Sequence, residues 1–272
     1  MSNIENDVYQ SYKIYELSYR EIMEHGHTEL MTRLFSQHIL PIIEKEIHCF
    51  SKKEKTTYIL EVGAGTCYPS YYIRIRKGRR GVGCLVIATD VSPYALKTAK
   101  KLSKYFGAKL DGLIACDCQY LPFKTDSFRT VHGIAFLHHI ESPEKACREI
   151  YRVLRRGGRF LGMEGAVNYF MKFFVNKISG AEFRGRVEKV RENIYSFDEW
   201  KHVFEKAGFE YSFFIVNSPS VYKSLIGRKS KCRSYKGRYL LRYVYETILT
   251  IVPNVLITRC LGATLSISAL KK

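Results

Sequence analysis

The sequence has no pair of cysteines in C-x-x-C spacing, although eight cysteines are distributed along its 272 residues. This absence argues against zinc ribbons and dithiol redox sites, in which two residues separate the paired cysteines. Cys116 and Cys118 could ligate a metal by residue type alone, but they belong to a segment that a nucleoside site explains better. We therefore expect no metal, and reduced thiols in a cytoplasmic protein.

Acidic residues are few: Asp and Glu number 26 against 44 Lys and Arg, which gives a formal charge of +18. Such a charge indicates an anionic partner, either a nucleic acid, a membrane surface or an acidic metabolite. The first residues, MSNIENDVYQ, lack the basic and then apolar order of a secretory leader. We expect a cytoplasmic protein, with the inner face of a membrane as a further location.

The apolar run 243–258 is too short to cross a membrane and is interrupted by Glu246 and Pro253. It belongs to an insertion, residues 220–260, whose segment 223–242 holds eight basic residues and no acidic one. One interpretation is an element that lies in an anionic membrane interface. The other is a basic surface loop followed by a helix packed on the core. The sequence favours both equally.

Short apolar runs alternate with helix-like stretches between residues 57 and 165, which is typical of a parallel sheet with helices on both faces. The expected strands are TYILEVG, CLVIATD, GLIACD, TVHGIAF and GRFLGMEG, followed by 209–216 and 262–270. The expected helices are 69–77, 93–106 and 142–155. Another helix should start at Ser196, where Glu199 completes a capping-box pattern, and end at Gly208.

These elements predict an α/β fold whose core consists of residues 51–219 and 261–272. Residues 1–50 show apolar residues at helical spacing and are expected to form two helices. We expect them to act as a helical lid over the carboxyl ends of the strands, where this class of sheet binds ligands.

The strongest local signal is Glu61-Val62-Gly63-Ala64-Gly65, which follows the first expected strand and leads into a helix. Glycines at such a turn allow a sharp bend and close approach of a ligand to the main chain. A nicotinamide-binding fingerprint would have a third small residue where this chain has Tyr68. The turn therefore favours a cofactor without a diphosphate.

Acidic residues stand at the ends of the next two expected strands. Asp90 is placed to accept hydrogen bonds from both ribose hydroxyls of a nucleoside, and Asp117 can accept one from an adenine amino group. Each aspartate alone is more often a turn or helix-cap residue. Together with the glycine turn, at the ends of consecutive strands, they indicate a ligand that contains a nucleoside.

With these residues the sequence resembles the class I S-adenosylmethionine-dependent methyltransferases, closest to the branch of the quinone-ring and sterol methyltransferases. Five motifs occur in family order: LEVGAGTC (60–67), ATDVS (88–92), ACDCQYLPF (115–123), FRTVHGIAFLHHI (128–140) and EIYRVLRRGGRFLGMEG (149–165). The resemblance covers roughly residues 55–215 and the last strand. It implies a Rossmann-like, doubly wound seven-stranded sheet with an antiparallel last strand, and S-adenosylmethionine as the cofactor.

The resemblance also implies roles for residues that bind the cofactor. Glu61, Gly63 and Gly65 would surround its methionine part. Asp90 would hold the ribose, and Val91 would pack on the adenine ring.

Further along the chain, Asp117 and the Cys118 backbone would meet the adenine edge, and Gly133 would line the cofactor near its amino-acid end. Two positions depart from the family pattern. Arg129 stands where members commonly have Asp, and His132 is unusual within a strand of this kind.

The reaction needs mainly alignment of the acceptor, because the sulfonium is already an activated methyl donor. An oxygen or nitrogen acceptor also needs a base, and imidazole titrates near neutral pH. His138 and His139 are candidates for the base, and Glu164 is a candidate for acceptor contact. The alternative interpretation of the two histidines is a structural pair with one ring packed beneath the site.

The quinone-methyltransferase resemblance and the insertion together predict a hydrophobic or membrane-associated small-molecule acceptor of lipid, quinone or isoprenoid type. The +18 charge and the basic cluster within 74–80 keep RNA, including tRNA, as the alternative acceptor. Against RNA, the sequence has no Asn-Pro-Pro-Tyr motif, no Pro-Cys motif and no evident appended RNA-binding domain, and its one Thr-Cys pair, Thr66-Cys67, belongs to the glycine turn. A binding or scaffold protein without turnover is a third interpretation, which saturable cofactor binding without turnover would favour.

Overall fold

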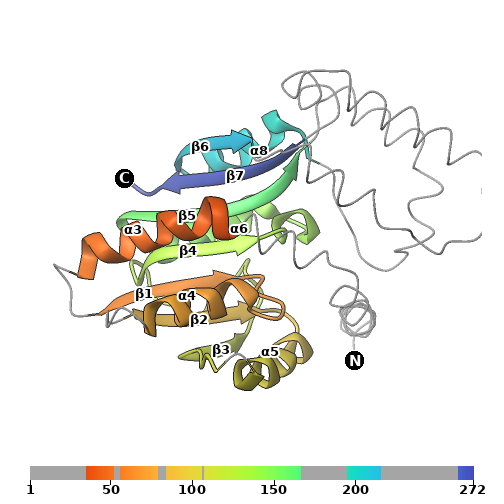
Figure 1. Cartoon of the computed structure of the whole chain (residues 1–272). Helices are drawn as coiled ribbons and strands as arrows, with labels where there is room; N and C mark the ends of the chain where they lie inside the picture. Colours follow the sequence, from red (N-terminus) through yellow and green to blue (C-terminus); the bar gives the residue numbers. More distant parts are fainter. Residues whose placement is uncertain (1–34, 52–55, 79–83, 106, 167–194, 216–262) are drawn as a thin grey trace, which may run out of the picture.

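The computed structural model describes residues 35–51, 56–78, 84–105, 107–166, 195–215 and 263–272. Within them it shows one seven-stranded sheet in the order β3-β2-β1-β4-β5-β7-β6, with helices on both faces (Figure 1). Strands β1 to β5 pair in parallel, and β7 is antiparallel to both β5 and β6. The predicted Rossmann-like sheet with an antiparallel last strand is therefore confirmed.

The elements follow the predicted order. The strands are β1 (Thr57–Val62), β2 (Cys84–Asp90), β3 (Gly112–Ala115), β4 (Phe128–Ile134), β5 (Leu154–Ala166), β6 (Glu210–Ile215) and β7 (Ala263–Leu270). The helices are a π-helical turn η1 (Phe35–Ile39), α3 (Leu40–Ser51), α4 (Tyr68–Gly78), α5 (Pro93–Tyr105), a 3₁₀ turn η2 (Leu137–His139), α6 (Pro143–Val153) and α8 (Phe197–Lys206).

The largest difference from the predicted boundaries is at β5, which begins at Leu154 rather than at Gly158. Leu154 pairs with Phe128, and the register then shifts before Arg159 pairs with Thr130. The intervening Gly157 has a φ of 69°, which a glycine adopts without strain. The sequence instead predicts a helix over 142–155 and a strand from Gly158, because the glycines of a bulge are the same residue type as those that end a helix or form a turn.

One face of the sheet is covered by α3, α4 and α5, which lie in front of the strands in Figure 1. Ile39, Ile43 and Ile47 recur at helical spacing along η1 and α3, and their side chains are buried. They share one apolar core with Ile59 of β1 and Leu161 of β5. Burial of this stripe holds α3 flat along the sheet.

The predicted N-terminal lid lies mostly outside the described residues, which begin at Phe35. The described remainder, 35–51, packs on the face of the sheet rather than across the carboxyl ends of its strands. The ring of Phe35 lies 5.9 Å from the ring of His132 in β4, between centroids. The second of the two predicted N-terminal helices is thus a core helix.

The other face carries α6 and α8, whose apolar residues pack against β4, β5 and β7. At the start of α8 the Ser196 hydroxyl accepts a hydrogen bond from the Glu199 N–H at 3.3 Å, and the Glu199 carboxylate accepts one from the Ser196 N–H at 2.7 Å. The predicted capping box is confirmed. Trp200 is fully buried and donates its indole N–H to the carbonyl of Gly165 at 2.9 Å, which fixes α8 to the end of β5.

β7 follows all the other strands in sequence but lies inside the sheet, between β5 and β6. Arg159 of β5 donates a hydrogen bond from Nη1 to the Ser268 hydroxyl of β7 at 2.9 Å, across 109 residues of sequence. The insertion 220–260 lies outside the described residues. Among the helices that the structure describes, none has the length and apolar character needed to cross a membrane.

Candidate cofactor and active site

The turn between β1 and α4 has an unusual backbone. Three of its residues have a positive φ: Gly63 (61°), Gly65 (51°) and Cys67 (60°). Glycine adopts this conformation freely, whereas Cys67 does so with a buried side chain, a strained arrangement of the kind found at ligand sites. The Ala64 N–H donates to the Thr89 carbonyl at 2.9 Å, which fixes the turn against the end of β2.

Asp90 joins this turn to the start of α5. One carboxylate oxygen accepts a hydrogen bond from the Gly65 N–H and the other accepts one from the Ser92 N–H, both at 2.8 Å. Burial raises the pKa of Asp90, and these two hydrogen bonds oppose that effect. Since a carboxylate has about four acceptor positions, Asp90 keeps capacity for ribose hydroxyls.

Glu61 is the penultimate residue of β1, just before the same turn. It is almost fully buried, with 2% of its surface exposed. Burial is the largest influence on its pKa, which is raised to about 8; the neighbouring Ser70 lowers the pKa, and the nearby Asp90 raises it. Its Oε2 atom has no hydrogen-bond partner among the described residues. A buried carboxyl group in this state is suited to a cationic ligand, which would favour its ionised form.

The ends of β2 and β3 lie side by side, because the Cys116 N–H donates to the Asp90 carbonyl at 3.0 Å. Val91 follows β2 with about half of its surface exposed, as a residue that packs on a ligand ring would be. Asp117 accepts hydrogen bonds from the backbone and side-chain amides of Gln119 at 2.8 and 3.1 Å. Sequence reasoning missed Gln119, which holds the Asp117 carboxylate in one orientation.

Cys118 is half-buried beside Asp117, and burial raises the pKa of its thiol. The thiol is therefore protonated and neutral near pH 7, where it is a weakly polar side chain of the site rather than a nucleophile. Within the residues that the structure describes, no three His, Cys, Asp or Glu side chains are grouped so that they could hold a metal ion.

The side chain of Phe136 lies against Gly63 and Gly133, the two glycines that were predicted to line the methionine part of the cofactor. A Cβ atom at Gly63 would be 2.5 Å from the Phe136 Cβ, and one at Gly133 would be 2.4 Å from its ring. Ala135, which precedes the ring, has a φ of 51° and donates its N–H to the Met163 carbonyl at 2.8 Å. No sequence pattern pointed to Phe136, because its role depends on contacts between β1 and β4.

Glu164 organises the chain that follows β4. Its Oε1 accepts the N–H groups of Phe136 at 2.9 Å and Leu137 at 2.8 Å, and its Oε2 lies 2.6 Å from His138 Nδ1. The carboxylate is only 1% exposed. The contact of Glu164 with the acceptor stays a prediction; within the chain, this carboxylate holds His138 and the two backbone N–H groups.

The two adjacent histidines differ. The His138 side chain contacts Glu164 through Nδ1 and has 22% of its surface exposed. The His139 ring lies 3.9 Å from it, and burial, followed by the proximity of His138, lowers the pKa of His139 to about 4. His139 is thus neutral near pH 7 and packs beneath the site, whereas His138 has the exposure and the carboxylate partner of a base.

The arrangement fits S-adenosylmethionine on three observations. Glu61 has a buried and unpaired carboxyl oxygen for the ammonium group of the methionine part. Asp90 is fixed beside the glycine turn, as expected for a residue that binds the ribose, and Val91 has an exposed apolar side chain that can pack on the adenine. These residues, with Asp117, lie at the carboxyl ends of β1, β2 and β3, where ligands bind in doubly wound sheets.

Comparison with known proteins supports this assignment. Residues 60–162 match the family model described as a methyltransferase domain. The chain is 26% identical over 221 residues to an uncharacterized protein of the archaeon Methanocaldococcus jannaschii, covering 71% of this chain and 80% of that protein. It is 29% identical over 171 residues to a ubiquinone/menaquinone biosynthesis C-methyltransferase of Bartonella quintana, covering 56% of this chain and 63% of that enzyme.

Among solved structures, geranyl diphosphate C-methyltransferase from Streptomyces coelicolor, in complex with Mg²⁺, geranyl diphosphate and S-adenosylhomocysteine, has a TM-score of 0.56. It is 11% identical, and the superposition covers 84% of this chain and 77% of that one. A geranyl diphosphate methyltransferase in complex with S-adenosylmethionine has a TM-score of 0.58 at 13% identity, with 84% of each chain covered. The motifs, the glycine turn and these likenesses agree: the chain contains a methyltransferase domain, has the fold of the class I methyltransferases, and is an S-adenosylmethionine-dependent methyltransferase.

Proposed function

We propose that this enzyme methylates a hydrophobic or membrane-associated small molecule of lipid, quinone or isoprenoid type, and that His138 removes a proton from the acceptor. The observation that carries the proposal is the 2.6 Å contact between His138 Nδ1 and the buried Glu164 carboxylate. A carboxylate in this position favours the tautomer with the proton on Nδ1, in which Nε2 carries the lone pair that accepts a proton.

The cofactor residues act by binding and alignment. Asp90 holds the ribose, Glu61 holds the ammonium group, and Val91 with Asp117 holds the adenine. S-adenosylmethionine, when bound, supplies a methyl group on a positively charged sulfur, which needs no further activation. The protein then has to place the acceptor atom in line with that methyl group and keep it there.

His138 and Glu164 handle the proton that the acceptor loses. In the resting enzyme the Nδ1–H of His138 donates to Glu164, and Nε2 has a lone pair. When the acceptor takes the methyl group, with cleavage of the sulfur–methyl bond and S-adenosylhomocysteine as the leaving group, the proton that the acceptor loses would pass to Nε2 of His138. The negative charge of Glu164 stabilises the imidazolium that results, and water removes its proton afterwards.

The acceptor class is supported by the relatives. The Bartonella enzyme is named for ubiquinone and menaquinone biosynthesis, and the Streptomyces structure contains geranyl diphosphate. The direct test is incubation of the full-length enzyme with isotope-labelled methyl donor and separate lipid and RNA extracts. We expect labelled lipid-soluble products, which mass spectrometry would identify; label in RNA alone would contradict the proposal.

A cytoplasmic location, with docking on the inner face of a membrane, is also part of the proposal. The basic and apolar segment 223–258 supports docking on anionic lipid, since each Lys or Arg near such a surface contributes about 1 kcal/mol. We expect the enzyme to sediment with anionic liposomes, to dissociate as salt rises and to ignore neutral liposomes. Deletion of 223–258 should abolish sedimentation and preserve cofactor binding. Sedimentation that ribonuclease abolishes would contradict docking on lipid.

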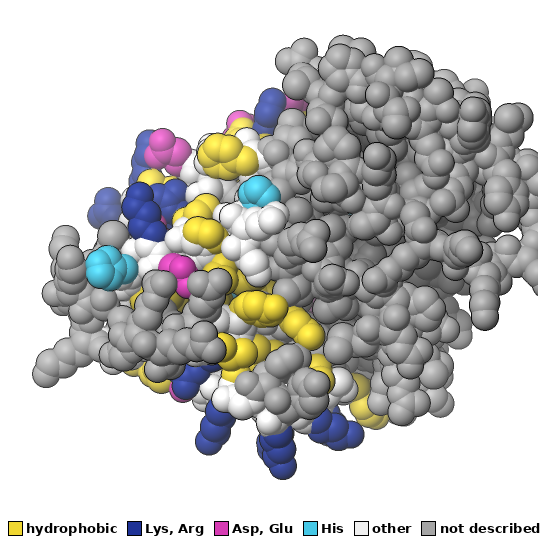
Figure 2. Space-filling view, in the orientation of Figure 1, with side chains coloured by type: hydrophobic (Ala, Val, Ile, Leu, Met, Phe, Trp, Pro, Cys, Tyr) yellow, Lys and Arg dark blue, Asp and Glu magenta, His cyan; other side chains and the backbone are white. Residues whose placement is uncertain are grey.

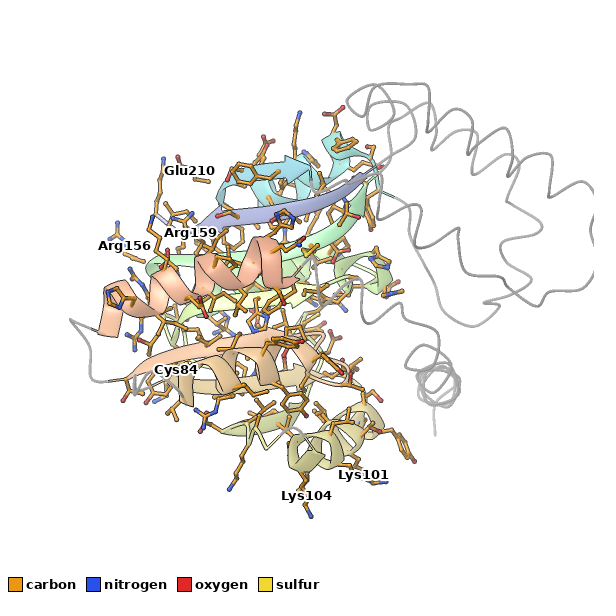
Figure 3. The ribbon with its side chains drawn as sticks, viewed as in Figure 1. Cys84, Lys101, Lys104, Arg156, Arg159 and Glu210 are labelled. Atoms are coloured by element: carbon orange, nitrogen blue, oxygen red, sulfur yellow. The ribbon has the colours of Figure 1, made fainter. Side chains whose placement is uncertain are left out.

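RNA is the second candidate acceptor, and one feature of the described structure favours it. Lys97, Lys100, Lys101 and Lys104 are spaced so that they form one stripe along α5, and no acidic residue interrupts that helix. Figure 3 shows Lys101 and Lys104 projecting from α5 away from the sheet, and Figure 2 shows basic side chains at the same end of the molecule. RNA methylation that is lost in a Lys101→Glu, Lys104→Glu variant and falls steeply with salt would establish this alternative.

A further inference from the structure

His132 is a buried polar residue that the proposed reaction does not use. It lies in β4 and is fully inaccessible, with 0% of its surface exposed. Neither of its ring nitrogens has a hydrogen-bond partner among the described residues. Because buried polar atoms are nearly always hydrogen-bonded in proteins, an imidazole with two unpaired nitrogens indicates a partner that the ring engages once that partner is ionised.

The register of the sheet identifies Glu61 as that partner. Glu61 of β1 pairs with His132 of β4 in parallel register, so that the two side chains leave neighbouring strands on the same face. On the opposite side His132 is paired with Leu161 of β5, and above it lies the ring of Phe35. Among these neighbours only Glu61 has a polar side chain, and its Oε2 is also unpartnered.

The charge states of the two residues are compatible with one hydrogen bond between them. Burial raises the pKa of Glu61 to about 8 and lowers the pKa of His132 to about 3, so both are neutral at pH 7 without ligand. A neutral imidazole has one N–H donor and one acceptor nitrogen. It can therefore accept from the protonated carboxyl group, and it can donate to the ionised carboxylate.

The remaining polar groups around Glu61 do not serve this function. Ser70 of α4 lowers the pKa of Glu61, and Asp90 raises it through its charge. The Ser70 hydroxyl itself has no hydrogen-bond partner among the described residues. The Cys67 thiol and the Tyr71 hydroxyl are both neutral, since burial raises their pKa values.

The helical elements that pack over His132 offer it no other hydrogen-bond partner among the described residues. η1 contributes Phe35 and Ile39, which are apolar. On α3, Glu46 is paired with Arg159 of β5 at 3.4 Å, and Glu44 has interactions of its own.

We propose that His132 is a positioning residue for the cofactor: it hydrogen-bonds to one oxygen of Glu61 and so directs the other oxygen to the ammonium group of S-adenosylmethionine. The inference rests on the proposed contact of Glu61 with the cofactor. The ammonium group favours ionised Glu61, whose charge then strengthens the bond from the His132 N–H. Cofactor binding is thereby coupled to the release of a proton from Glu61.

Calorimetry with S-adenosylhomocysteine between pH 6 and pH 9 tests the proposal. In the wild-type enzyme the affinity should rise with pH up to about 8 and then level off, by at most about tenfold per pH unit. Measurements in two buffers of different ionisation enthalpy should show release of up to one proton below pH 8. Glu61→Gln should remove both effects, because the amide does not titrate.

His132→Leu should weaken binding about tenfold and move the levelling point to higher pH, because ionised Glu61 loses a charge-assisted donor. His132→Gln, which keeps an N–H donor, should restore part of both. His132→Met, a flexible apolar replacement, serves if the Leu variant does not fold. Thr130→Val is the matched control: Thr130 is buried and unpartnered on the same strand and face, but it is paired with Ile59 rather than Glu61.

The outcomes separate the positioning role from the cofactor site. An unchanged levelling point in folded His132→Leu or His132→Met protein would overturn the role of His132. If Glu61→Gln binds S-adenosylhomocysteine as the wild-type enzyme does across the pH range, Glu61 does not contact the cofactor, and the inference falls with that contact. An equal shift in Thr130→Val would show that β4 packing, not His132, sets the pKa of Glu61, which also contradicts the proposal.

Discussion

The ring of Phe136 occupies the space that a side chain at Gly63 would need, with its Cβ atom 2.5 Å from the position of a Cβ there. The same ring lies equally close to Gly133, so one aromatic residue requires glycine at the ends of both β1 and β4. The glycine turn is therefore shaped by a neighbouring strand as well as by its own backbone.

Gly63→Ala should destabilise the protein by about 1–3 kcal/mol and abolish detectable cofactor binding, because the ring of Phe136 cannot be accommodated beside a methyl group. Gly107→Ala is the matched control, since Gly107 has a φ of 60°, close to the 61° of Gly63, and no atom within 4 Å of an added Cβ. Urea unfolding and calorimetry would separate the two. Equal losses in both variants would show that φ alone, not Phe136, selects glycine.

Asp90→Ala should weaken S-adenosylhomocysteine binding by about 1.5–3 kcal/mol, because it removes a charged acceptor from the ribose and releases the Gly65 and Ser92 N–H groups. Asp111→Ala is a suitable control, since Asp111 also accepts a backbone N–H, that of Val86 at 2.8 Å, next to β3. Calorimetry should show no change of affinity in the control. Unchanged affinity in Asp90→Ala would mean that other residues hold the ribose.

Glu164→Gln should lower kcat by roughly a hundredfold and leave cofactor affinity nearly unchanged, because the amide no longer stabilises charge on His138. His138→Asn should have a similar effect, and the double variant should be little worse than either, as expected for residues that act together. Glu149→Gln is the control, because Glu149 also holds a backbone N–H, that of Leu121 at 2.9 Å, without a histidine. Full turnover by Glu164→Gln would exclude the proposed base.

The stability of the protein should depend on pH through buried groups of opposite sign. Burial lowers the pKa values of His132 and His139 to about 3 and 4, so the unfolded chain binds more protons below pH 6.5 and stability falls on acidification. Burial raises the pKa of Glu61 from 4.5 to about 8, so the folded chain binds more protons in that window and stability falls as pH rises through it.

For these three groups together, the free energy of unfolding should rise from pH 4.5 to about 6.5, where two histidines outweigh one glutamate, and fall from there to pH 8. Urea titrations at intervals between pH 4.5 and pH 9 would measure this curve. His132→Leu should flatten its acidic side, and Glu61→Gln its alkaline side. A maximum above pH 8 in the wild-type protein would contradict the assignment of Glu61.

The features that the sequence predicted well are those with a local cause. The capping box of Ser196 and Glu199 needs only residues three apart, and the glycine turn follows from adjacent residues. The stripe of Ile39, Ile43 and Ile47 predicted a helix in the same way.

Other features depend on which strands are neighbours. The sequence did not show that α3 packs on the face of the sheet, because amphipathic spacing does not name the surface that is covered. Glu164 and His138 stand 26 residues apart, and only the register of β4 with β5 brings them into contact. The pairing of Glu61 with His132 likewise requires the order of β1 and β4.

β7 has to enter the sheet between two strands that precede it in the chain. Until residues 263–270 arrive, β5 exposes an unpaired edge, and open edges of this kind recruit strands from other molecules. The contacts that complete the sheet join distant residues, such as Arg159 and Ser268, and long loops close slowly. A newly synthesised or refolding chain therefore passes through an aggregation-sensitive stage, and the yield of soluble protein is set by how fast the last strand is captured.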